Sequence, residues 1–576
     1  MRKNMSSNIT TKFFKYLINP IFAILLGISI LASMWQLGSY IINAPHSKII
    51  VLLICFFVIG CSVAIFFKPE CFKKTCNYFQ QHVQLILKII IAVTILWQLM
   101  MAISLAGESW WDPGIISYVA SHRSIQHWFP GYFSYYPNNF FLLVLERIVW
   151  NCLTIFKIAS YVHLVQILAV LSYVLVDLSI WLIYKTLRQN LGQQKSAWIA
   201  TGMLWFLIGI TPFAVIPYSD ILVMFLSSLV LWLGTQLKLD FARKNIILVV
   251  VIGLIVAIGY LIKPTIMIFI VALFIMVMIN LKKRTLKPLI IFALIFGWSF
   301  GTMVTAVHYY QRHNSIIKIN ESKSMPMNHF IAMGLIGNGG YNEQDVQKNK
   351  HIQDPQKRKE VNNQLIIERL KKRGLVNYLI FLAKKQTLNT GAGTFAWGAD
   401  AGYGFLVVKN SHPKNLFVKL PRKIFMQYDA PNNLWIANSN WHGVAILFQV
   451  GWMITLMTAL FSIKSSNMFA SLIRLTIVGA FMFLLLFEGG RSRYMVQFLP
   501  FIITLTGVGS NLIWKNNKFR SGEKNDKETN WMGRYGEIFS YIIDDCWSWI
   551  TLWKFTDDHF LLSYATLLYS VWVYFA

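Results

Sequence analysis

The chain has few charged residues. Only 13% of its 576 residues are Asp, Glu, Lys or Arg, whereas a soluble protein of this size carries about 25%. Acidic residues are the scarcer kind, with 24 against 53 Lys and Arg, so the formal net charge is +29. This composition excludes an ordinary soluble enzyme. No compact basic domain accompanies the charge, which excludes nucleic acid as the expected partner.

Several signatures of known chemistry are also missing. The six cysteines, at positions 55, 61, 71, 76, 152 and 546, lack metal-ligand spacing, so no metal site is predicted from them. The glycine-rich stretch 334–340 is not followed by Gly-Lys-Ser/Thr, which excludes a P-loop. No Ser-His-Asp elbow, zinc signature or dinucleotide fingerprint occurs. The absence of an internal repeat weakens the hypothesis of an inverted-repeat transporter.

Long apolar runs are what the chain has in abundance. Hydrophobic residues make up 56% of it, and runs of about 16 to 25 residues are long enough to cross a bilayer as helices. We therefore predict an all-α polytopic membrane protein of about 12–13 transmembrane helices with a large extracellular loop subdomain. The twelve candidate spans are 19–43, 48–67, 85–105, 160–184, 197–212, 220–236, 245–262, 264–281, 288–309, 443–463, 471–487 and 495–514. A run at 559–575 is either a thirteenth span or an interfacial helix.

Loop charge gives the orientation. Lys and Arg precede the first span and follow every even-numbered one, and all these loops fall on one side if residues 138–157 do not cross. The positive-inside rule makes that side the cytoplasm. We expect a multi-pass protein of the cell membrane with a cytoplasmic N-terminus, and no cleavable signal peptide. Because Glu146 and Arg147 interrupt residues 138–157, this segment is predicted to be an amphipathic helix on the outer surface.

Five regions follow from this topology. The loop 310–442 is too long for a connector, so we expect a small folded subdomain that is partly helical around 355–373. The regions are an N-terminal pair of spans with a cytoplasmic loop (1–84), a membrane core with external loop 106–159 (85–309), the large external loop (310–442), the C-terminal spans (443–514) and a tail (515–576).

Two carboxylates follow the span 85–105, in the segment Gly107–Gly114, which reads GESWWDPG. Asp112 and Glu108 are therefore expected at the outer membrane surface, where a carboxylate can act as a general base toward lipid-borne substrates. The alternative interpretation is that both are solvated loop carboxylates beside an aromatic belt. Asp112 is the first choice because it lies further into the loop.

Polar and aromatic side chains crowd the same loop, in the string GYFSYYPNN at 131–139. Tyr136, Asn138 and Asn139 are of the kinds that stack on sugar rings and hydrogen-bond hydroxyls, although tyrosines also anchor proteins at the interface.

Charged side chains recur at other predicted outer ends of spans. Asp220 follows Pro-Tyr-Ser, where it can serve as a helix cap or first-turn acid. Lys263 either snorkels or contacts a lipid phosphate. Arg491 and Arg493 lie outside against the charge rule, and they either pair with Glu488 or bind a phosphate.

Four short motifs, WWDPG (110–114), YYPNN (135–139), PYSD (217–220) and GGRSRY (489–494), lie in this arrangement of spans and loops. Over about residues 85–510 the chain resembles the GT-C membrane glycosyltransferases, most of all the protein O-mannosyltransferase and aminoarabinose-transferase branch and its Gram-positive relatives. The resemblance implies that Asp112 is the base acting on the acceptor. It implies that Arg491, Arg493 and Lys263 hold the phosphate of a polyprenyl carrier.

The implied activity is an inverting glycosyl transfer on the outer face, from a polyprenyl-phosphate-linked sugar to an acceptor hydroxyl. The acceptor is a glycan, a teichoic acid or a protein, and the lipid bilayer is the other partner. No cofactor is required by the residues, although some relatives use a divalent metal ion (Mg²⁺ or Mn²⁺). Two alternatives are open: a transporter or flippase of a lipid-linked glycan, and a polysaccharide polymerase or ligase.

Overall fold

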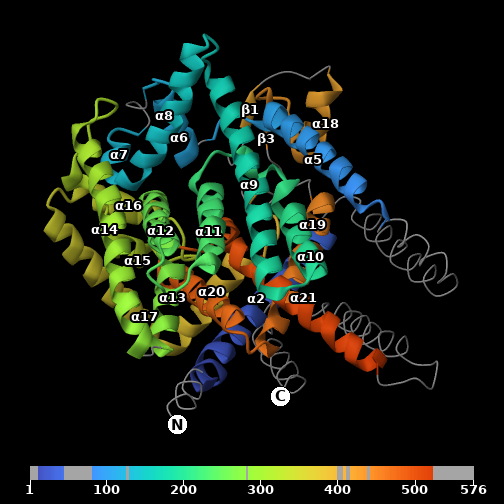
Figure 1. Ribbon diagram of the computed structural model, residues 1–576. Helices are drawn as coiled ribbons and strands as arrows, with labels where there is room; N and C mark the ends of the chain where they lie inside the picture. The colour runs from blue at the N-terminus through green and yellow to red at the C-terminus, as the bar shows by residue number, and fades with distance from the viewer. Residues whose placement is uncertain are drawn as a thin grey trace. The chain divides into compact units, whose positions relative to one another are not determined.

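The computed structural model describes residues 11–43, 81–109, 111–124, 129–280, 283–397, 407–409, 415–436 and 442–522. The chain divides into two compact units, Met1–Trp514 and Lys515–Ala576, and the elements that build the site all belong to the first. The described part is almost entirely helical (Figure 1). Its elements are η1 (Phe14–Ile18), α2 (Asn19–Asn43), α5 (Val83–Leu105), α6 (Asp112–Ala120), α7 (Tyr132–Tyr135), η2 (Pro137–Asn139), α8 (Phe140–Ile155), α9 (Tyr161–Leu191), α10 (Gln194–Leu204), η3 (Trp205–Gly209), η4 (Pro212–Val215), α11 (Ser219–Gln236), α12 (Arg243–Ile262), η5 (Pro264–Ile266), α13 (Met267–Ile279), α14 (Lys283–His313), η6 (Glu321–Lys323), α15 (Met327–Met333), α16 (Glu343–His351), α17 (Pro355–Thr390), β1 (Val407–Lys409), α18 (Leu416–Phe425), β2 (Gln427–Asp429), β3 (Leu434–Ile436), α19 (His442–Leu460), η9 (Phe461–Lys464), α20 (Met468–Leu486), η10 (Ser492–Phe498) and α21 (Leu499–Gly522).

Among the described residues, nine helices are long and apolar enough to cross a membrane. They coincide with nine of the twelve predicted spans, which confirms an all-α polytopic membrane protein. Of the other three, 48–67 lies outside the described residues, as does the run 559–575. The segment 264–281 forms a shorter apolar helix, Pro264–Ile279. In the segment 197–212, α10 continues without a break into the π-helical turn η3, which ends at Gly209, and this helix is not among the nine.

Helix α8 occupies the segment that the charges at 146 and 147 set apart from the spans, and it is not one of the nine. Glu146 and Arg147 are buried. The Ser117 hydroxyl of α6 donates to Glu146 at 2.7 Å, and Arg147 donates to the Val119 carbonyl at 2.5 Å. The charged face of α8 therefore packs on α6, the short helix that begins with Asp112.

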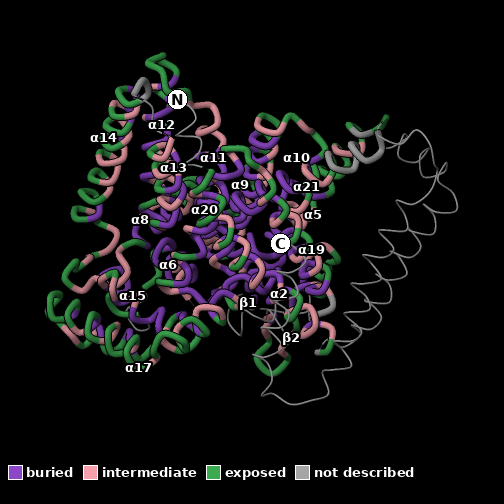
Figure 2. The backbone as a smooth tube through the Cα atoms, turned by 90° about the horizontal axis from the view of Figure 1, so that it is seen from below, coloured by how far each residue is buried: buried purple, intermediate pink, exposed green. Residues whose placement is uncertain are grey.

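Hydrogen bonds between helices join the spans. Gln449 of α19 donates to the carbonyls of Ser33 in α2 at 2.9 Å and of Gly391 at 2.7 Å. Gln98 of α5 donates to Asp177 of α9 and to the Gly209 carbonyl, both at 3.0 Å. Such bonds contribute to association inside a membrane, where apolar burial between helices gives little advantage over lipid. Figure 2 shows the buried core around α9, α11 and α20, with more exposed colouring along α14 and α17.

The connection between α10 and α11 packs against α9 well past the N-terminal end of that helix. The Tyr173 hydroxyl of α9 donates to the Thr211 carbonyl at 2.8 Å. Tyr173 is twelve residues past Tyr161, the first residue of α9, which is roughly 18 Å along a helix that rises about 1.5 Å per residue. Turn η4 and the residues leading into α11 therefore lie beside the body of α9, away from its N-terminal end.

The large loop is folded, and its helical part extends beyond the predicted 355–373. Helix α17 runs over Pro355–Thr390, with a sharp bend at Gly374 where φ is +68°. The loop also holds a three-stranded antiparallel sheet, ordered β1-β3-β2, in which Trp435 of β3 lies between Val408 and Tyr428. Glu108 and Val407 exchange backbone hydrogen bonds of 2.7 and 2.9 Å, which tie this sheet to the segment before Asp112.

Candidate functional site

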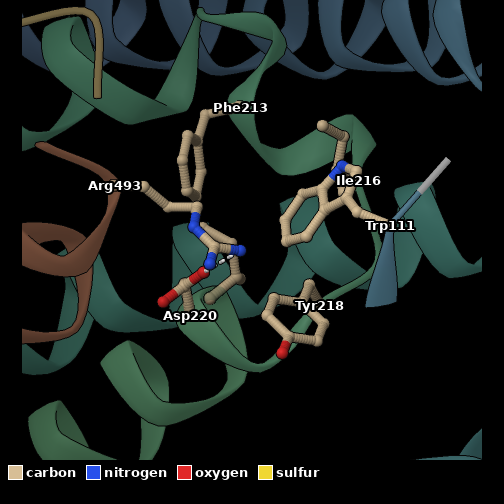
Figure 3. Close-up of a pocket in the computed structure, with 7 residues that line it drawn as sticks. Trp111, Phe213, Ile216, Tyr218, Asp220 and Arg493 are labelled. Atoms are coloured by element: carbon tan, nitrogen blue, oxygen red, sulfur yellow. Dashed lines mark ion pairs between the residues drawn. The ribbon is translucent and has the colours of Figure 1, made fainter. Parts of the chain in front are cut away.

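A small pocket lies where the first external loop, η4, the start of α11 and η10 meet. It has about 210 Å³ of empty space, part of it open to solvent. Figure 3 shows the Arg493 guanidinium inside it, beside Asp220 and facing the rings of Trp111 and Tyr218. Its lining residues are Trp111, Phe213, Ile216, Tyr218, Asp220, Ile221 and Arg493.

Arg493 is the central cation of the pocket and is 7% exposed. Its guanidinium carbon lies 4.2 Å from the ring centroid of Trp111, 5.3 Å from that of Tyr218 and 5.0 Å from that of Tyr494. Among the described residues, no hydrogen-bond partner is found for its buried Nε and Nη1 atoms. Buried donors are normally satisfied, so these two nitrogens indicate a place for an anion.

Asp220 supplies the negative charge next to that guanidinium. It lies in the first turn of α11 and is 2% exposed, and the side chain does not cap the helix. The Lys263 ammonium donates to Asp220 Oδ1 at 2.6 Å, whereas Arg493 Nη1 stays 3.8 Å from Oδ2. Lys263 is thus hydrogen-bonded to Asp220, and Arg493 forms a longer ion pair with the same carboxylate.

This shared carboxylate predicts unequal effects of two substitutions. Asp220→Asn leaves two buried cations without their anion, and breaking a buried ion pair typically costs about 3–5 kcal/mol of folding free energy. Lys263→Met should cost less, because Arg493 already lies near the carboxylate that remains. The measurement is thermal unfolding of the purified proteins in detergent. An equal loss in both variants, or a larger one for Lys263→Met, would contradict the shared role of Asp220.

Asp112 lies beside the pocket and is held by two tyrosines. Tyr132 donates to its Oδ1 at 2.7 Å, and Tyr218 donates to its Oδ2 at 2.9 Å. Burial, with the nearby Asp112 charge as the next cause, raises the pKa of both phenols well above the ordinary value, so both stay protonated and keep donating. Tyr218 therefore connects the carboxylate with the Arg493 pocket through one side chain.

The local sequence explains the position of Asp112. It is the first residue of α6, where the positive end of the helix dipole stabilises a carboxylate, and Pro113 suits the opening turn. A Cβ at Gly114 would collide with the carbonyl of Ser109, so a side chain here would force the chain apart just before Asp112. The Asp-Pro-Gly part of the motif is thus the start of a helix that directs one carboxylate toward the site.

The segment 487–490 carries a third acid to the site. Glu488 accepts a 2.9 Å hydrogen bond from the Tyr494 hydroxyl, and burial raises the pKa of its carboxyl. Gly490 has a φ of +72° and no room for a Cβ beside the Asn338 carbonyl. The Asn389 side chain of α17 accepts from the Gly490 amide at 2.6 Å. The large loop therefore holds the chain that leads into Arg493.

The remaining predicted residues are dispersed around this centre. Tyr136 is half-buried, and burial, with Asp112 and Glu488 adding to it, raises the pKa of its phenol. Asn139 is buried and donates to the Tyr132 hydroxyl at 2.6 Å, and the exposed Asn138 donates to Asn139 at 3.3 Å. Tyr136 and Asn139 are thus close to Asp112, directly or through Tyr132.

Of the ten predicted site residues, Asp220 and Arg493 line the pocket, and the other eight, among them Glu108 and Arg491, do not. The Glu108 side chain adjoins Tyr118, whose phenol has its pKa raised by burial and then by that carboxylate. Arg491 is exposed, whereas Arg493 is buried in the pocket. Trp111 contacts Arg493 through its ring, and Tyr218 donates to Asp112. The sequence did not predict these two contacts, although both residues belong to the motifs WWDPG and PYSD.

A divalent metal does not fit the side chains present. Among the described residues, no group of three or more His, Cys, Asp and Glu comes together to hold a metal ion. Both oxygens of Asp112 already accept tyrosine hydrogen bonds, and Asp220 is bound to Lys263.

No curated protein matches the sequence. Among solved structures, the chain is similar to the archaeal oligosaccharyltransferase AglB from Archaeoglobus fulgidus, determined in complex with an inhibitory peptide and a dolichol-phosphate. The TM-score is 0.38 and the identity 13%, over 81% of this chain and 54% of that protein, so the chain spans about half of its length. The model of one protein family matches residues 6–514. The chain belongs to that family, described as conserved hypothetical integral membrane protein.

Proposed function

We propose that this protein is a membrane glycosyltransferase that moves a sugar from a polyprenyl-phosphate carrier to an acceptor hydroxyl on the outer face of the membrane. The observation that carries the proposal is Arg493, a buried guanidinium in a pocket next to Asp112. Its Nε and Nη1 atoms have no hydrogen-bond partner among the described residues, and the Asp220 carboxylate lies 3.8 Å from Nη1. A planar guanidinium binds phosphate oxygens in pairs. The Asp112 carboxylate beside it accepts one tyrosine hydrogen bond at each oxygen and keeps further lone pairs that can accept a proton.

The reaction is a single displacement. Asp112 takes the proton of the acceptor hydroxyl as that oxygen attacks the anomeric carbon. The bond from the anomeric carbon to the phosphate oxygen breaks, and its electron pair stays on the leaving phosphate. Arg493 stabilises the charge that develops there. Attack opposite the leaving group inverts the anomeric centre, and no covalent intermediate with the protein is needed.

The tyrosines and Lys263 support these two groups. Tyr132 and Tyr218 orient the Asp112 carboxylate. Lys263 neutralises Asp220 at 2.6 Å, so that this second acid does not cancel the guanidinium charge. Tyr136 and Asn138 are side chains of kinds that suit contact with sugar hydroxyls.

A deletion strain tests the proposal in the cell. Loss of the gene is expected to remove one sugar from surface glycans, teichoic acids or surface proteins, and the intact gene should restore it. Restoration by the Asp112→Asn gene would refute the proposed base. A change in polymer length without loss of a sugar would favour a polymerase or ligase, and accumulation of a lipid-linked glycan on the inner side would favour a flippase.

A further inference from the structure

The second half of α17, residues 375–390, has its polar and apolar faces reversed. Three polar side chains, Lys385, Gln386 and Asn389, are 0% exposed. A helix on the surface of a soluble protein buries its apolar face and exposes its polar one. Here most of the exposed side chains are apolar, with exposures of 75% for Leu375, 70% for Val376, 57% for Leu379 and 41% for Ile380. The polar side chains of Asn377 and Lys384 are exposed as well.

The polar face of this helix packs against membrane spans. Gln386 donates to the Ser29 hydroxyl of α2 at 3.1 Å, and Trp452 of α19 donates to the Thr390 carbonyl at 2.7 Å. Ser29 lies near the middle of the span Thr11–Ile42. The contact therefore places the end of α17 at the depth of the bilayer, even though it belongs to a loop between spans.

We infer that the second half of α17 is a re-entrant membrane helix whose exposed apolar face lies against lipid acyl chains. The bend at Gly374 separates it from the charged first half. Its sixteen residues, 375 to 390, make a helix of about 24 Å, shorter than the roughly 20 residues that a crossing needs. The chain enters the bilayer and turns back without crossing it.

The positive charge next to the bend at Gly374 also fits contact with the lipid bilayer. Lys371 and Lys372 are exposed and come directly before the turn at Gly374. Lysines at the end of a membrane segment interact favourably with lipid phosphates. Arg373 instead folds back, with its guanidinium carbon 4.0 Å from the Phe381 ring centroid. The two free lysines thus mark the level of the headgroups.

The buried face of the helix reaches the candidate site. Lys385 donates to the carbonyls of Gly334 at 2.9 Å and Leu485 at 3.1 Å, and Asn389 accepts from the Gly490 amide. A helix held by lipid on one side therefore fixes, on the other, the segment that carries Glu488 and leads to Arg493. This membrane contact does not depend on the proposed transfer reaction.

Spin-label accessibility in the full-length protein tests the inference. In a background with all cysteines replaced, single cysteines at Leu379 or Ile380 carry a nitroxide label in vesicles of phosphatidylcholine and phosphatidylglycerol. Collisions with apolar oxygen should exceed those with a water-soluble nickel chelate at both positions. The matched control is Glu360→Cys, exposed on the first half of α17, where the nickel chelate should dominate.

The outcome that overturns the inference is a nickel-to-oxygen ratio at 379 and 380 equal to that at 360. Val376→Cys provides a third site on the same face if either label prevents folding. High oxygen accessibility at 376, 379 and 380 together establishes the lipid contact, because a protein-covered face would exclude both collision partners.

Discussion

Replacing Asp112 with asparagine is expected to lower the rate of sugar transfer by about 10²–10⁴-fold, the usual contribution of a positioned general base. Asparagine has the size of aspartate, and its amide oxygen can still accept from one of the two tyrosines, Tyr132 or Tyr218. Its NH2 group only donates, so the side chain cannot take up the acceptor proton. The measurement is transfer of a labelled sugar by the purified protein in vesicles, with thermal unfolding as a check on folding.

Glu108→Gln is the matched control for this substitution. Both carboxylates come from the same segment, but Glu108 adjoins Tyr118, whereas Asp112 accepts a hydrogen bond from Tyr218, which lines the pocket. Its replacement should change the rate by less than about threefold, in line with a group that neither donates nor accepts the transferred proton. Full activity of the Asp112→Asn variant, or a large loss of activity in the Glu108→Gln variant, would show that Asp112 is not the base.

Replacing Arg493 with glutamine is expected to lower transfer by about 10²–10³-fold, the effect of removing one donor to a developing oxyanion. Affinity for the lipid phosphate should fall as well, because the free Nε and Nη1 donors disappear. Arg493→Lys keeps the charge without the two-pronged geometry and should recover only part of the activity. The rate and the Michaelis constant for the donor are both measured.

Arg491→Gln provides the comparison for this second prediction. Arg491 is two residues away and exposed, whereas Arg493 is buried in the pocket. A loss confined to Arg493 would support the pocket as the phosphate site. Equal losses in both variants would point to a general surface attraction for anionic lipid.

The spans were predictable from the sequence because their signal is local. A run of about twenty apolar residues needs no partner to identify it, since an unpaired backbone in lipid leaves few structures open. The π-helical turn within the predicted span 197–212 could not be predicted in this way. The composition of that segment is that of a span, and the π-helical turn η3 arises where Trp97 of α5 donates to the Ile210 carbonyl at 3.1 Å, a tertiary contact.

The motifs brought most of the site together but not the roles within it. More than a hundred residues separate Asp112 from Asp220 in the sequence, and more than a hundred separate Asp220 from Arg493. Only the packing of α6, α11 and η10 brings them together. Spacing alone could not tell Arg491 from Arg493. The difference between them lies in the tertiary structure, in which the Arg493 side chain turns inward against the Trp111 ring.

The reversed faces of α17 were hidden in the sequence for a related reason. A run such as Leu375–Leu382 with a following Lys-Lys-Gln indicates an ordinary amphipathic helix. Only the contacts with α2 and α19 identify the polar face as the buried one. The hydrophobic pattern gives the period of a helix, and the surroundings decide which face meets protein.

The most direct test of the account separates lipid binding from transfer in the same preparations. Binding of polyprenyl phosphate and transfer of a labelled sugar from its glycosylated form are measured for the unaltered protein, Asp112→Asn and Arg493→Gln in vesicles. We predict that Asp112→Asn binds the lipid phosphate normally but does not transfer, and that Arg493→Gln loses binding. Unchanged binding by Arg493→Gln, together with unchanged transfer by Asp112→Asn, would contradict the proposed site.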